Sequence, residues 1–196
     1  YVMSDEIYEH IYYDNYKPFS FARIDKMYDK TITVNGLSKA YAMTGWRVGY
    51  IGAPEWIAKA CTKLQGQTTS GTNCIAQRAA ITALKSPLNK IKYMIDEFNF
   101  RRNRILDLIK DIDGFKINRP KGAFYVFPDI SNFFGKSING TKIKNATDFS
   151  LFLLEKANVA TVTGDAFGCP NNIRISYAAS LEKIEDALNR IKNVLN

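Results

Sequence analysis

Histidine, cysteine and long apolar runs are all scarce in this sequence of 196 residues, and each scarcity excludes a class of protein. The single histidine, His10, lies beside Glu9 but near no nucleophile motif, so we expect no Ser-His-Asp or Cys-His hydrolase. The three cysteines, Cys61, Cys74 and Cys169, form no CxxC pair, which argues against a zinc site and a disulfide framework. No apolar run approaches the roughly 20 residues of a transmembrane helix. We therefore expect reduced thiols, no metal, no membrane partner and a cytoplasmic location.

Positive charge is in modest excess, because 27 Lys and Arg residues face 19 Asp and Glu residues and give a net charge of +8. The densest basic cluster is Arg101-Arg102-Asn103-Arg104, and elsewhere the lysines are interspersed with acidic residues. This distribution favours a solvated, lysine-rich surface over a nucleic-acid interface, so we expect no nucleic-acid partner. With 46% hydrophobic and 23% charged residues, the composition is that of a folded globular protein.

The N-terminus has neither an initiator methionine nor a basic segment followed by an apolar one, so we expect no signal peptide. Residues 1–13 are rich in Tyr, Val and Ile and are typical of a strand that runs into a loop. Because the chain starts within this predicted strand, we interpret it as a fragment of a longer protein.

Hydrophobic periodicity predicts an α/β domain, a long helix and a small α+β domain. We expect the remainder of a large domain at 1–86, a connecting helix at 87–113 and a small C-terminal domain at 114–196. Further strands are predicted at 30–34, 46–52, 115–118, 124–127, 159–163 and 173–177. Further helices are predicted after Pro54, at 75–85, at 147–157 and after Ser180, which is a good N-cap.

The residues most suited to catalysis lie between Val34 and Tyr50. A predicted strand leads into Ser38-Lys39, and Arg47 follows at the start of the next strand. A lysine in a confined site loses its proton more readily and forms a Schiff base with an aldehyde. A hydroxyl and an arginine suit a phosphate group, so the three together suit a phosphorylated aldehyde such as pyridoxal phosphate. On spacing alone, a loop lysine and a salt-bridged arginine explain the pattern equally well.

The segment SKAYAMTGWRVGY at 38–50 resembles the cofactor-lysine signature of class I/II (fold-type I) pyridoxal-phosphate-dependent aminotransferases. The resemblance extends over the whole chain and is closest to the prokaryotic aspartate aminotransferase subgroup. It implies the C-terminal half of that α/β fold. Four further blocks are similar to family segments: Ser4–Tyr8, Gly122–Tyr125, Gly164–Gly168 and Ile173–Ala178.

The resemblance implies a catalytic role for three residues. Lys39 would form the Schiff base with pyridoxal phosphate and then move a proton between Cα and C4′ as general base and acid. Asp5 would pair with the pyridine nitrogen and keep it protonated, which makes the ring an electron sink. Tyr8 would donate a hydrogen bond to the phenolic oxygen of the cofactor.

The resemblance also implies anion-binding roles. Ser38 and Arg47 would hold the cofactor phosphate, and Arg174 would bind the α-carboxylate of the substrate through its bidentate fork. The family often has a serine three residues before the lysine, whereas this chain has Gly36. The loop Thr69-Ser70-Gly71 aligns with one that faces the cofactor phosphate of the neighbouring subunit.

The function implied is an aminotransferase that moves an amino group from an L-amino acid, aspartate by overall similarity, to a 2-oxo acid, 2-oxoglutarate. The resemblance further implies a homodimer in the full-length form. Family residues that read the donor side chain lie upstream of this chain, so donor specificity and the activity of the isolated fragment stay open. Alternatives are a pyridoxal-phosphate lyase, an aminotransferase of other donor specificity, or an aminotransferase-like cofactor-sensing domain of a transcription regulator.

Overall fold

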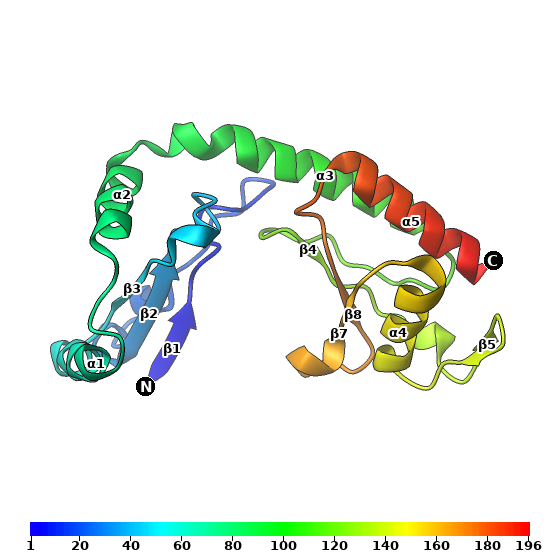
Figure 1. Ribbon diagram of the computed structural model, residues 1–196, viewed down its shortest axis with the longest axis horizontal. Helices are drawn as coiled ribbons and strands as arrows, with labels where there is room; N and C mark the ends of the chain where they lie inside the picture. Colours follow the sequence, from blue (N-terminus) through cyan, green and yellow to red (C-terminus); the bar gives the residue numbers. More distant parts are fainter. The chain divides into compact units, whose positions relative to one another are not determined.

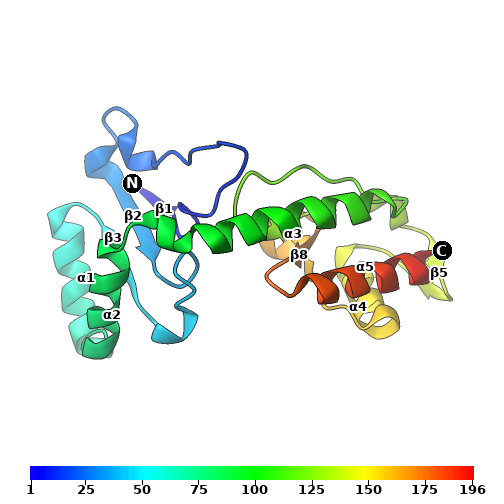
Figure 2. The same ribbon diagram turned by 90° about the horizontal axis from the view of Figure 1, so that it is seen from above.

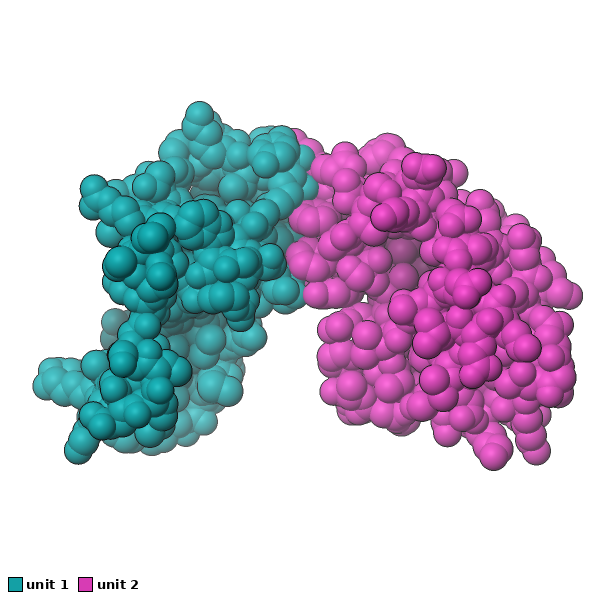
Figure 3. Space-filling model, in the orientation of Figure 1, with its two compact units in different colours: residues 1–95 teal, residues 96–196 magenta.

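The computed structural model describes residues 1–196 and divides into two compact units, residues 1–95 and 96–196 (Figure 3). Each unit contains its own small sheet with flanking helices (Figure 1). None of the helices combines the length and the hydropathy that a membrane-spanning helix needs.

Unit 1 is built on a three-stranded sheet in the order β1-β2-β3. The strands are β1 (Val2–Asp5), β2 (Thr31–Gly36) and β3 (Gly49–Gly52). The β-branched run Thr31-Ile32-Thr33-Val34 favours an extended backbone, which accounts for β2 at the centre of the sheet. β1 runs parallel to β2, and β3 runs antiparallel to it.

Two helices follow the sheet of unit 1, α1 (Glu55–Thr68) and α2 (Cys74–Lys85). Pro54 precedes α1, and the side chain of Asn73 caps α2 by accepting hydrogen bonds from the backbone N–H groups of Ile75 and Ala76. Three 3₁₀ turns lie in the connections between the strands of this sheet: Phe21–Arg23, Tyr28–Lys30 and Thr44–Trp46.

The long helix predicted at 87–113 consists of two pieces. A 3₁₀ turn (Leu88–Ile91) follows Pro87, and α3 (Lys92–Lys110) follows that turn. Helix α3 places Phe98, Ile105 and Ile109 in the core of unit 2 at helical spacing. Figures 1 and 2 both show α5 (Leu181–Leu195) lying along it.

Unit 2 contains a three-stranded antiparallel sheet in the order β4-β8-β7 and a two-stranded hairpin. Its core is aromatic and aliphatic, with Phe149, Ile173 and Tyr177 fully buried. The Ser180 side chain accepts from Lys183 N, so the predicted N-cap of the last helix is confirmed. Its elements are β4 (Tyr125–Val126), β5 (Ser137–Ile138), β6 (Thr141–Lys142), α4 (Ala146–Ala157), β7 (Val162–Thr163), β8 (Ile173–Ser176) and α5 (Leu181–Leu195).

Two strand predictions are corrected by the structure. The strand predicted at 115–118 is reduced to a single antiparallel bridge between Lys116 and Asp129, whose other side bridges to Asn172. The strand predicted at 46–52 begins only at Gly49, because Arg47 adopts a left-handed backbone conformation with φ of 53°. The β5–β6 hairpin was not predicted, although Asn139-Gly140 at its turn is a typical hairpin signal.

Candidate active site

Three residues implied by the resemblance lie next to one edge of the unit 1 sheet. Asp5 is the last residue of β1 and pairs in register with Val34 of β2, which precedes Lys39 by five positions. β3 starts at Gly49, directly after the segment that contains Arg47, and Gly49 pairs with the end of β2. In open α/β sheets, ligands bind at the carboxyl ends of the parallel strands, and this is that edge (Figure 1).

The Asp5 carboxylate is exposed to solvent at the end of β1. Its Oδ1 atom accepts a hydrogen bond from the backbone N–H of Ile7 at 3.1 Å, which holds the carboxylate over the turn that follows. Backbone hydrogen bonds from Glu6 N to Val34 O and from Glu9 N to Glu6 O close that turn. Tyr8 lies within it and is half-buried.

Ser38 and Lys39 lie in a tight turn directly after β2. Leu37 and Ala40 on either side are buried, with 0% and 2% of their surface exposed, and they anchor the turn in the core. The turn is closed by backbone hydrogen bonds from Ala42 N to Lys39 O and from Met43 N to Leu37 O. Ser38 and Lys39 themselves are half-buried.

Gly36 occupies the position, three residues before the lysine, where the family often has a serine. The packing of the neighbouring backbone explains why glycine is found here. A Cβ atom at this position would lie 3.1 Å from the backbone oxygen of Val48 and 3.2 Å from Cα of Gly49. The close approach of β3 to β2 therefore favours glycine here.

Arg47 is exposed and borders a hollow of about 700 Å³ in unit 1. Its Nη1 atom donates to the backbone oxygen of Thr44 at 2.8 Å, which leaves other N–H donors of the guanidinium for an anion. Gln65, Thr69 and the segment Gly71–Asn73 also line the hollow. A guanidinium beside hydroxyl and amide groups is suited to a phosphate.

A polar cluster that the sequence analysis missed lies beside this turn. Asn35, 8% exposed, donates from Nδ2 to Glu9 Oε1 at 2.6 Å, and His10 Nε2 lies 3.4 Å from the same oxygen. Burial raises the pKa of the Tyr41 and Tyr50 phenols, and the Glu9 carboxylate raises each pKa further. Both phenols are therefore neutral at physiological pH. The sequence contained no signal for this cluster beyond the polar residues themselves.

Arg174 belongs to unit 2 and lies on β8, in register with Val162 of β7. It is half-buried, and its guanidinium carbon lies 4.5 Å from the ring centroid of Tyr125 and 4.6 Å from that of Phe167. An ordinary strand arginine on a solvated face does not have two such contacts. Tyr125 and Phe167 stand in the blocks that resemble the family, but their spacing did not indicate contact with Arg174.

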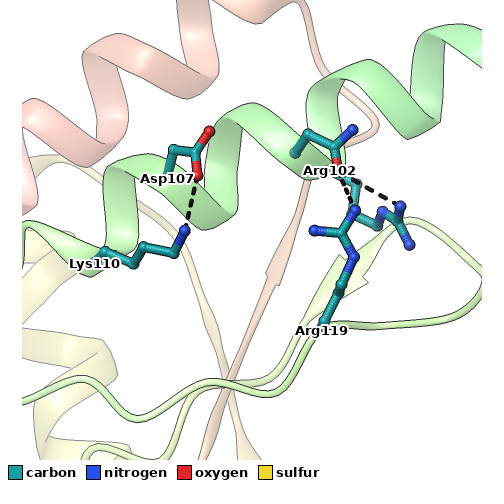
Figure 4. A network of polar contacts seen from close by, with 5 residues as sticks. Arg102, Asp107, Lys110 and Arg119 are labelled. Carbon is teal, nitrogen blue, oxygen red and sulfur yellow. Dashed lines mark hydrogen bonds and ion pairs between the residues drawn. The ribbon is translucent and has the colours of Figure 1, made fainter.

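The segment that leads into Tyr125 is held by polar contacts with α3. Arg102 is fully buried on α3 and donates to the backbone oxygen of Pro120 at 2.8 Å and to Asn99 Oδ1 at 2.7 Å. Figure 4 shows Arg102 and Arg119 converging on one amide oxygen, that of Asn103. These contacts fix the connection between α3 and β4.

The structure thus brings Asp5, Tyr8, Ser38, Lys39 and Arg47 to one end of the unit 1 sheet and places Arg174 in unit 2. The first group contains an amine, a carboxylate, a phenol, a hydroxyl and a guanidinium.

Comparison with known proteins identifies the family. Residues 1–191 match the profile of the family described as aminotransferase class I and II, so the chain belongs to that family. It is 47% identical over 198 residues to the bifunctional aspartate aminotransferase and glutamate/aspartate-prephenate aminotransferase of Petunia hybrida, with 99% of this chain and 41% of that protein covered. It is 42% identical to the aspartate aminotransferase of Rhizobium meliloti, with 97% and 47% covered.

Solved structures agree with this assignment. The crystal structure of the Rhizobium meliloti aspartate aminotransferase superposes with a TM-score of 0.93 at 42% identity, covering 98% of this chain and 49% of that one. The aromatic aminotransferase from Pyrococcus horikoshii OT3 gives a TM-score of 0.89 at 39% identity, covering 98% and 50%. The chain therefore has the α/β fold of these aminotransferases and spans about half of their length.

Proposed function

We propose that this chain is the C-terminal half of a pyridoxal-phosphate-dependent aspartate aminotransferase. The observation that carries the proposal is the shared sheet edge of Asp5, Lys39 and Arg47, in a chain that belongs to the aminotransferase family. In this proposal residues 1–86 belong to the large cofactor-binding domain and residues 114–196 form the small C-terminal domain. The helix at 87–113 connects the two domains. The full-length protein is a cytoplasmic homodimer.

The residues at this edge fit pyridoxal phosphate. Lys39 is half-buried in a turn held by buried neighbours, Arg47 borders the hollow, and Asp5 has an exposed carboxylate at the end of β1. Lys39 would hold the aldehyde carbon, Ser38 and Arg47 the phosphate, Asp5 the pyridine nitrogen and Tyr8 the phenolic oxygen. When bound, the group supplies an electron-withdrawing ring that stabilises negative charge at the substrate Cα.

The chain's own residues then perform the proton transfers and the binding. Lys39 Nζ would remove the proton from Cα of the bound amino acid as a general base. In the return half-reaction, Lys39 would deliver a proton to the carbon of the 2-oxo acid that becomes Cα of the new amino acid. Asp5 would hold the protonated pyridine nitrogen through a hydrogen bond, and Arg174 would bind the α-carboxylate of the substrate.

Aspartate as donor is supported by the names of relatives such as the aspartate aminotransferases of Pinus pinaster and Rhizobium meliloti. The proposed acceptor, 2-oxoglutarate, comes from the sequence resemblance to this family. Prephenate is a second acceptor candidate, because the relatives from Petunia hybrida and Rickettsia conorii carry it in their names. The experiment below distinguishes this proposal from the alternatives, which are another amino donor or acceptor, a lyase, and a cofactor-sensing regulator domain.

The test uses the full-length protein with pyridoxal phosphate and a Lys39→Ala variant. We expect a visible absorbance band that requires Lys39, that aspartate shifts, and that either 2-oxoglutarate or prephenate restores. A Lys39-dependent band that no amino acid shifts would contradict the proposal and favour a cofactor-sensing regulator domain. Release of ammonia and a 2-oxo acid without an acceptor would instead identify a lyase.

A further inference from the structure

Two aromatic rings from different segments of unit 2 meet at Arg174. Tyr125 comes from β4, and its ring centroid lies 4.5 Å from the guanidinium carbon. Phe167 ends the 3₁₀ turn Gly164–Phe167, and its ring centroid lies 4.6 Å away. The negative face of an aromatic ring attracts a cation at this distance, so both rings stabilise the charged guanidinium where it stands.

These contacts leave the hydrogen-bond donors of Arg174 for a ligand. Contact with a ring face uses none of the N–H donors of the guanidinium in a conventional hydrogen bond. No hydrogen bond or ion pair within the chain involves this guanidinium either. Other arginines of unit 2 differ, since Arg104 pairs with Glu185 and Arg190 pairs with Asp186. The two rings thus hold the charged guanidinium of Arg174 in place, while its planar set of N–H donors can still bind a carboxylate.

The backbone fixes both rings. The Tyr177 hydroxyl donates to the backbone oxygen of Ala123 at 3.1 Å, and β4 pairs Tyr125 with Ser176, two residues from Arg174. On the other side, the Thr163 hydroxyl caps the turn that ends in Phe167. The Phe167 ring also packs edge-to-face on Phe127, with centroids 5.9 Å apart.

We infer that Tyr125 and Phe167 are positioning residues that hold the Arg174 guanidinium ready to bind the α-carboxylate of the substrate. The inference rests on the proposed function, which assigns that carboxylate to Arg174. A free arginine side chain has many rotamers, and ordering it on binding costs conformational entropy. Rings that order the side chain before the ligand arrives remove part of that cost and so tighten binding.

The experiment measures carboxylate binding by the full-length protein loaded with its cofactor. Phe167→Leu and Tyr125→Leu remove a ring, whereas the matched controls Phe167→Tyr and Tyr125→Phe keep one. The probe is succinate, a dicarboxylate without an amino group, titrated by calorimetry. We expect each leucine variant to weaken succinate binding by about 3- to 30-fold and to raise the KM for aspartate similarly, with kcat within about threefold. The ring-keeping variants should bind within about twofold of the unmodified protein.

A second comparison separates positioning from general packing. Phe167→Leu is repeated in an Arg174→Ala background, where a residue that acts through Arg174 has no further effect on succinate binding. The inference is overturned if the leucine variants bind as tightly as the unmodified protein, or if Phe167→Leu weakens binding equally in both backgrounds. It is also overturned if Arg174→Ala itself leaves succinate binding unchanged. The Lys39-dependent absorbance band is unaffected by these outcomes and tests the cofactor site separately.

Discussion

Asn35 at the end of β2 donates a hydrogen bond from Nδ2 to Glu9 Oε1 at 2.6 Å, while its own Oδ1 accepts from Gly36 N at 2.7 Å. Residues 9 and 35 are far apart in the sequence, and this contact joins the turn that follows β1 to the strand that leads into Lys39. Asn35 is 8% exposed, whereas 36% of the Glu9 side chain is exposed, so the hydrogen bond is partly buried. The hydrogen bond therefore ties together the two segments that carry the proposed cofactor-binding residues.

Removing this contact is expected to destabilise the protein. Glu9→Ala leaves the buried Asn35 amide without its acceptor, which should lower the free energy of unfolding by about 1–3 kcal/mol. Glu9→Gln keeps an oxygen acceptor and should cost less. Denaturant unfolding of the full-length protein measures both, and equal stability of the alanine variant and the unmodified protein would show that the contact is unimportant.

The raised phenol pKa values of Tyr41 and Tyr50 predict a loss of stability at high pH. In each case burial disfavours the charged phenolate, and Glu9 adds to the effect. A folded-state pKa raised above the ordinary value of 10.0 gives stability that is fully present below that pH and is lost as the pH rises through the raised value. Glu9→Gln should lower the pKa of both phenols, which is measured from tyrosinate absorbance as the pH is raised. Titration curves that are the same with and without Glu9 would contradict an effect of the Glu9 carboxylate on these phenols.

Arg47→Ala should weaken pyridoxal phosphate binding. The loss of a charge-assisted hydrogen bond is worth about 1.5–3 kcal/mol, which corresponds to about 10- to 150-fold in the dissociation constant. Arg47→Lys keeps the charge but not the planar fork, so we expect an intermediate value. Arg23→Ala, at another exposed arginine, is the control. A fall in affinity of the same size for Arg23→Ala would point to net charge and not to a phosphate contact.

Gly164→Ala should be among the most damaging substitutions in unit 2. A Cβ atom there would lie 2.0 Å from the backbone oxygen of Cys169 and 2.5 Å from that of Asn172, so the backbone has to move. We expect a loss of more than about 3 kcal/mol in the free energy of unfolding.

The matched substitution is Gly66→Ala within α1. No atom lies within 4 Å of its added Cβ, and alanine favours a helix over glycine by about 1 kcal/mol. Thermal unfolding should therefore show a higher midpoint for this variant and a much lower one for Gly164→Ala. A stable Gly164→Ala protein would mean that the 164–172 turn adapts easily.

Local residue chemistry was sufficient for much of this protein. β-branched residues predicted the central strand of unit 1, Ser180 predicted the start of α5, and the window around Lys39 identified a family that the family match confirms. These features succeed because backbone preference, capping and motif spacing depend on residues close together in the chain. The strand predicted at 115–118 was wrong because hydrogen-bond pairing there depends on the partner segment as well.

Tertiary structure alone decided the relations between distant segments. The register of β1 on β2 places Asp5 beside the end of the strand that leads into Lys39. The hydrogen bond between Asn35 and Glu9 stabilises that arrangement. In unit 2, the convergence of Tyr125 and Phe167 on Arg174 depends on how β4, β8 and a 3₁₀ turn pack. A hydrogen bond or ring contact forms only where folding brings two groups within a few ångströms. The sequence by itself therefore determined which chemical groups are present, and the packing within each unit determined which of them lie close together.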